Sequence, residues 1–71
     1  MRPRLSHDEA YASVRLAVER HLHMHGTLNV EQFRRLTDSD RREAIVWLDR
    51  LVQGRVIREH THGRGAFYTR V

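Results

Sequence analysis

The chain contains no cysteine and no lysine. The lack of cysteine excludes disulfide bridges and thiolate metal sites. With 71 residues, the chain can form one domain with one small core, which leaves little room for a deep catalytic cavity. No apolar run approaches the roughly 20 residues that a membrane-spanning helix needs, and nothing resembles a signal peptide. We therefore expect a single-domain cytoplasmic protein that does not enter a membrane.

The patterns that accompany enzyme chemistry are also missing. The sequence has no serine or cysteine nucleophile signature, no glycine-rich phosphate loop and no paired-carboxylate constellation. Helix capping and solvation account for Asp40, Glu43 and His62 more simply than catalysis does. We expect neither enzymatic activity nor a cofactor.

The positive charge at neutral pH comes from one residue type, because all 13 lysine or arginine positions are arginine. The formal net charge is +4 and the sequence pI is about 11.0. Arginine pairs in a bidentate manner with phosphates and guanine edges, so this composition favours nucleic acid as the partner. A genome-wide preference for arginine codons is an equally good explanation of the missing lysine, but it leaves the net charge in place.

The N-terminal half predicts one long helix after a short flexible basic arm at residues 1–5. Ser6 and Glu9 have the spacing of a capping box. The helix is expected from His7 to His25, and Gly26 is expected to end it. Steps of three and four residues place one apolar set on a common face. This set is Ala10, Tyr11, Val14, Ala17, Val18 and Leu22.

Two shorter helices joined by a polar turn are expected next. The second helix spans Val30 to Leu36, the turn covers residues 37–40, and the third helix starts at Asp40 and ends near Gly54. Two capping boxes support these starts. They are Asn29 with Gln32 and Asp40 with Glu43.

A hairpin is expected at the C-terminal end. Its strands are Val56–Thr61 and Ala66–Thr69, and Gly63 and Gly65 permit a tight reversal between them. Leu28 is expected to form a short extended link that pairs with this hairpin.

These elements predict an α+β, mostly α fold. Residues 6–71 would form a three-helix winged helix-turn-helix with a C-terminal two-stranded β-hairpin wing. Trp47 is expected at the edge of the core. The expected core is Val14, Val18, Leu22, Leu28, Phe33, Leu36, Ala44, Leu48, Leu51, Ile57 and Phe67.

About half of the chain resembles a known family. The segments Gly26–Thr37, Asp40–Ile45 and Leu48–Leu51 are similar to the C-terminal winged-helix repeats of the selenocysteine-specific elongation factors. Those repeats carry a phenylalanine-arginine pair in helix two and a basic pair at the start of helix three. The resemblance implies nucleic-acid binding by helix three and the wing. The residues that would carry it are Arg41, Arg42, His62 and Arg64.

The chain also departs from this family. It is far shorter than an elongation factor and has no GTPase part. Asp40 stands where many relatives have serine or threonine. Gly54 comes one residue before the usual glycine, and Arg55 occupies that place.

The site predicted from these residues is a duplex DNA interface. Arg41 and Arg42 lie in the first turn of helix three, where a recognition helix contacts bases and phosphates. Arg50 is expected to add a contact further along, and His62 and Arg64 would reach the backbone from the wing. A small transcriptional regulator is the function that this arrangement favours.

Other partners stay open. Asp38, Asp40 and Asp49 bring negative charge to the same surface, while Ile45 and Val46 place apolar area there, which favours a protein-interaction module. An RNA stem-loop would use the same residues as duplex DNA.

A second copy of the chain is another expected partner. One such domain covers limited DNA surface, so specificity favours a dimer. Helix one is the expected dimer face, through Tyr11 and Leu16, which the core does not need.

The six histidines pose a metal question. His21 and His25 lie four residues apart on helix one, and His60 and His62 alternate on one strand face. A four-histidine site would require the end of helix one to meet the wing. Without supporting carboxylate or cysteine ligands, we expect no metal.

Overall fold

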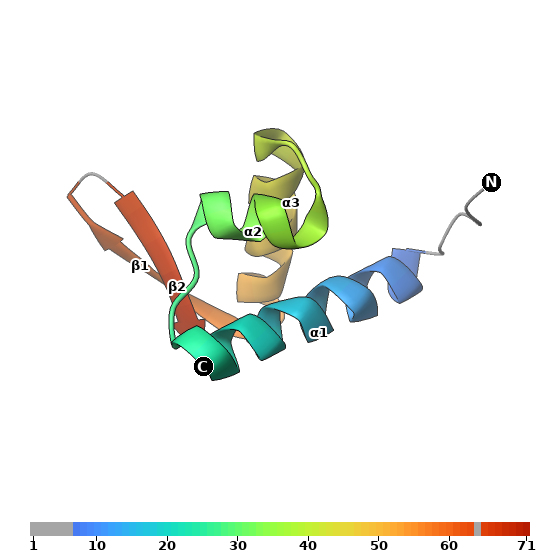
Figure 1. Ribbon diagram of the computed structural model, residues 1–71, viewed down its shortest axis with the longest axis horizontal. Coiled ribbons are helices and arrows are strands. Elements are labelled where there is room, and N and C mark those ends of the chain that lie inside the picture. The colour runs from blue at the N-terminus through green and yellow to red at the C-terminus, as the bar shows by residue number, and fades with distance from the viewer. Residues whose placement is uncertain (1–6, 64) are drawn as a thin grey trace.

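Three helices and a two-stranded antiparallel hairpin follow one another along the chain (Figure 1). The computed structural model describes residues 7–63 and 65–71. This order and the mostly helical content confirm the predicted α+β layout of a winged helix-turn-helix. The expected arm and the Ser6 cap lie outside the described residues. The elements are α1 (His7–His25), α2 (Val30–Thr37), α3 (Arg41–Gln53), β1 (Ile57–His62) and β2 (Gly65–Arg70).

Side-chain caps set the starts of α2 and α3. The Asn29 side chain accepts a hydrogen bond from the Gln32 amide at 2.8 Å, and the Gln32 side chain accepts one from the Asn29 amide at 2.9 Å. The predicted capping box of α2 is therefore present. At α3, the Asp40 carboxylate accepts from the Glu43 amide at 2.8 Å. These bonds satisfy amides that the helices leave without partners.

The turn between α2 and α3 is closed by its own polar groups. Asp38 adopts a left-handed backbone with φ of 50°, which aspartate tolerates better than most residues. The Thr37 hydroxyl donates to the Phe33 carbonyl at 2.9 Å and lies 2.7 Å from the Ser39 hydroxyl. The turn therefore holds α3 at a defined angle to α2.

The hairpin is joined to the helices through Leu28. Its register runs from Ile57 opposite Arg70 to His62 opposite Gly65. The Leu28 amide donates to the Tyr68 carbonyl at 2.9 Å, and the Tyr68 amide donates to the Leu28 carbonyl at 2.7 Å. This pair confirms the predicted link and attaches the α1–α2 connection to β2.

Three predicted core members differ from the structure. Val14 is only partly buried and packs against the edge of the buried set. Leu36 is 41% exposed, because it lies about 60° around α2 from Phe33, on the side away from Val30 and Thr37. Phe67 is only half-buried, and its neighbour Tyr68 takes the buried place that pairs with Leu28. The buried set is Val18, Leu22, Leu28, Phe33, Ala44, Leu48, Leu51, Ile57 and Tyr68.

The end of α3 carries a non-glycine residue in the left-handed region. Arg55 has φ of 59°, whereas Gly54 has φ of −78°. The glycine thus precedes the position that needs it, and Arg55 bears the steric cost of a Cβ there.

Arg55→Gly is expected to raise the free energy of unfolding by about 0.5 to 1 kcal/mol, since relief of this strain exceeds the added chain entropy. Urea denaturation measures the change. Arg55→Ala removes the same charge but keeps the Cβ, so it should bring no such gain. An equal gain in both variants would assign the effect to charge and refute the strain.

Candidate nucleic-acid interface

The outward side of α3 follows from its buried side. Ala44, Leu48 and Leu51 are buried against the core. Steps of four, three and four residues on the opposite side join four exposed residues, which we call the outer stripe. The outer stripe is Arg42, Val46, Asp49 and Gln53.

The outer stripe carries varied chemistry. Val46 is 56% exposed. The Gln53 side-chain amide donates to the Asp49 carboxylate at 2.9 Å, so part of that negative charge is already bonded within the helix. The stripe thus offers a guanidinium, an apolar spot, a carboxylate and an amide along one helix face.

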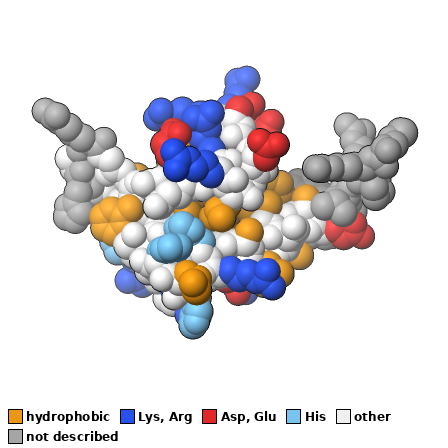
Figure 2. All heavy atoms as spheres, viewed as in Figure 1, with side chains coloured by type: hydrophobic (Ala, Val, Ile, Leu, Met, Phe, Trp, Pro, Cys, Tyr) orange, Lys and Arg blue, Asp and Glu red, His pale blue; other side chains and the backbone are white. Residues whose placement is uncertain are grey.

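Exposed arginines gather at the N-terminal end of α3. Arg41 and Arg42 are both exposed, as is Arg35 on α2. Arg34 is held in place, with its guanidinium 3.3 Å from the Glu31 carboxylate and donating to the Ser39 carbonyl at 3.4 Å. Arginine and acidic side chains together cover this end of the molecule (Figure 2). The predicted arginine pair is therefore accessible beside several carboxylates.

Arg50 lies against aromatic rings. Its guanidinium carbon is 5.4 Å from the Trp47 ring centroid and 5.7 Å from that of Tyr11 on α1. The expectation that the core does not need Tyr11 is wrong, because Tyr11 packs against the core and lies 6.4 Å from the Trp47 ring. A Cβ at Gly54 would lie 2.7 Å from the Tyr11 hydroxyl oxygen. Glycine there leaves room for the Tyr11 hydroxyl at the end of α3.

The hairpin contributes a second surface. The rings of His60 and Phe67, opposite one another in register, are stacked at 4.9 Å with an interplanar angle of 9°. His60 Nε2 lies 2.8 Å from the Thr69 hydroxyl. In Figure 1, the hairpin extends on the same side of α1 as the α2–α3 turn. Arg64 and the side chain of His62 lie outside the described residues.

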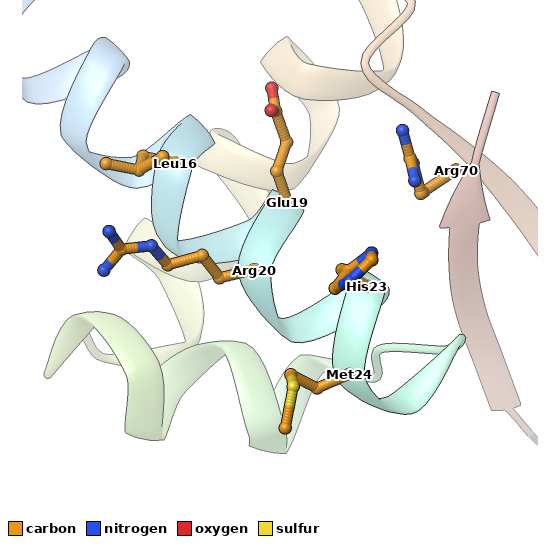
Figure 3. A pocket seen from close by; sticks show the side chains of 6 residues that line it. All are labelled: Leu16, Glu19, Arg20, His23, Met24 and Arg70. Atoms are coloured by element: carbon orange, nitrogen blue, oxygen red, sulfur yellow. The ribbon is translucent and has the colours of Figure 1, made fainter.

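The outer face of α1 holds a shallow groove of about 440 Å³ (Figure 3). Leu16 is 52% exposed and Met24 is 75% exposed. Arg15 donates to Glu19 at 2.6 Å along the same helix, and this hydrogen bond raises the pKa of Arg15 above its ordinary value. The lining residues are Leu16, Glu19, Arg20, His23, Met24 and Arg70.

The histidines of α1 lie close together. The ring centroids of His21 and His25 are 4.6 Å apart, and the buried His21 Nε2 has no hydrogen-bond partner among the residues that the structure describes. Among residues 7–63 and 65–71, no three side chains of the metal-binding types come together.

Over the same residues, no helix combines the length and apolarity needed to cross a membrane.

The sequence alone predicted Arg41, Arg42 and Val46 as exposed residues of α3, but it did not point to Gln53 on the outer stripe. Counting four, three and four residues from Arg42 would have found it. The orientation of Arg50 depends on how α1 crosses α3, for which the sequence carries no local signal.

Comparison with protein-family models, curated proteins and solved structures found nothing that matches this chain.

Proposed function

We propose that this protein binds duplex DNA and regulates transcription, with α3 in the major groove and the hairpin beside it. The observation that carries the proposal is the exposed pair Arg41 and Arg42 in the first turn of α3, of which Arg42 lies opposite the buried side of the helix. The net charge of +4 attracts a polyanion to the whole chain.

The geometry of α3 suits this role. A major groove about 12 Å wide accepts a helix, and the N-terminal end of a helix favours phosphate. Arg42 faces outward on the outer stripe, and Arg41 lies beside it. Arg50 is the weaker contributor, because its guanidinium already packs over Trp47 and Tyr11.

The hairpin tip supplies the second set of proposed contacts. Gly63 has a positive φ of 53°, which lets the chain reverse sharply there. His62 and Arg64 flank this glycine, and we assign them contacts to the DNA backbone beside the groove.

A salt titration of binding to random-sequence duplex DNA tests the proposal. Arg41→Ala with Arg42→Ala should weaken binding at low salt by about tenfold or more, and should reduce the slope of log affinity against log salt by about 2. Fluorescence anisotropy of a labelled duplex measures both quantities.

The matched control removes two arginines from the α1 groove, with Arg20→Ala and Arg70→Ala. It should reduce affinity much less, because Arg20 and Arg70 line the α1 groove and not the N-terminal end of α3, where the proposed contact lies. Equal losses in both double variants would refute the assignment to α3. Tighter binding to an RNA stem-loop than to duplex DNA at matched salt would identify RNA as the partner, and no binding at low salt would indicate a protein partner.

A second copy of the chain is the second candidate partner, favoured by the exposed Leu16 and Met24 on α1. This face also carries both charge signs, through Glu19 and Arg20, so two copies can oppose unlike charges across it. A helix about 28 Å long offers less area than a standard interface, so we expect a weak dimer.

Sedimentation over a range of concentrations should show dimers at high concentration, and Leu16→Glu should remove them. Val46→Glu, on α3, is the control and should leave them unchanged. A monomer at every concentration would eliminate this partner.

A further inference from the structure

Val46 is the apolar residue of the outer stripe, and Ile45, which is 50% exposed, lies about 100° around α3 from it. On a helix surface, the neighbours of a residue lie three and four positions away. For Val46, these neighbours are all charged, and Val46 itself is 56% exposed. A groove of about 370 Å³ runs beside it, lined partly by Trp47. The four neighbours are Arg42, Glu43, Asp49 and Arg50.

This setting argues against a protein partner at Val46. The buried centre of a protein–protein interface is depleted of charged residues, and a surrounding ring of near-neutral contacts excludes water. An apolar protein surface laid over Val46 would also desolvate the charged side chains of Arg42 and Glu43, which such a surface does not pair.

The major-groove edge of a base pair is a better partner for Val46 and its charged neighbours than a protein surface. In the major groove, thymine is the base that presents an apolar group, its 5-methyl, and this group lies close to hydrogen-bond donors and acceptors of neighbouring bases. Arg42 can donate to guanine or phosphate one turn before Val46, and Asp49 can accept from cytosine about one turn after it. The charged ring around Val46 then faces polar base edges.

We propose that Val46 contacts the 5-methyl group of thymine and gives the chain a preference for thymine at that position. This inference rests on the proposed DNA binding and adds the base that one residue recognises. Burying one methyl group against Val46 should favour a thymine duplex over its uracil counterpart by about threefold to tenfold.

The probes are an alternating adenine–thymine duplex and the same duplex with uracil replacing thymine. They share length and charge and differ in the methyl group. The unaltered chain should bind the thymine duplex more tightly, and Val46→Ala, which removes two methyl groups, should reduce this preference. Val71→Ala, the same change at a valine that is 65% exposed after β2, is the control and should keep the preference.

The outcomes separate this inference from the function on which it rests. Salt-dependent binding with equal affinity for both duplexes overturns the contact at Val46 and leaves DNA binding in place. A preference that is as large in Val46→Ala as in the unaltered chain also overturns it, because the methyl group is then sensed elsewhere. Failure to bind either duplex at low salt overturns DNA binding and this inference together.

Discussion

Replacing Phe33 with alanine is expected to lower the free energy of unfolding by about 3 to 5 kcal/mol. Phe33 is the buried residue of α2 and is fully enclosed in the core. Its loss would leave a cavity that α2, α1 and α3 could close only in part. A chain of this size has a total stability of about 4 to 10 kcal/mol, so much of the folded population would be lost.

Urea denaturation followed by circular dichroism measures this effect. Leu36→Ala is the control on the same helix, and its 41% exposure predicts a loss below about 1 kcal/mol. Phe33→Leu keeps most of the volume and provides a folded variant if Phe33→Ala does not fold. A cost at Leu36 as large as that at Phe33 would mean that α2 turns a different face to the core.

For α2, the sequence predicted the start of the helix but not which of Phe33 and Leu36 is buried. The cap at Asn29 was predictable because its hydrogen bonds join residues three apart. Helical periodicity could not choose Phe33 over Leu36 for the centre of an eight-residue helix. That choice depends on the side from which α1 and α3 approach.

In the hairpin, the sequence likewise could not tell which of two neighbouring aromatic residues is buried. Strand alternation requires Phe67 and Tyr68 to face opposite sides, but it does not say which one faces the core. The two hydrogen bonds between Leu28 and Tyr68 decide it, since they bring the α1–α2 connection onto β2. Phe67 then lies on the other face and stacks on His60.

The candidate site was predictable to a similar extent. The exposure of Arg42 follows from the helical repeat, and that of Arg41 from its place in the first turn, directly after the cap at Asp40. The position of Arg50 over Tyr11 joins residues far apart in the chain, and a Cβ at Gly54 would crowd the Tyr11 hydroxyl there. Contacts of this kind follow from tertiary packing rather than from local pattern.

Alkaline titration is expected to destabilise the protein through Tyr68. Burial of the ring, and then the Glu59 carboxylate, raise the pKa of Tyr68 to about 12, and its hydroxyl donates to Glu59 at 3.2 Å. The unfolded chain would lose this proton near pH 10. The stabilising contribution is therefore complete below pH 10 and is lost as the pH rises to about 12.

Over this interval, the free energy of unfolding should fall by about 1 to 2 kcal/mol, after allowance for solvent screening of Glu59. Urea denaturation at a series of pH values from 9 to 12 measures the slope. Tyr68→Phe cannot ionise, so its stability should change less over the same interval. Glu59→Gln removes the carboxylate and should reduce the slope in part, because burial is the larger cause of the raised pKa. If the unaltered chain and Tyr68→Phe had the same pH dependence, Tyr68 could not be the group that titrates.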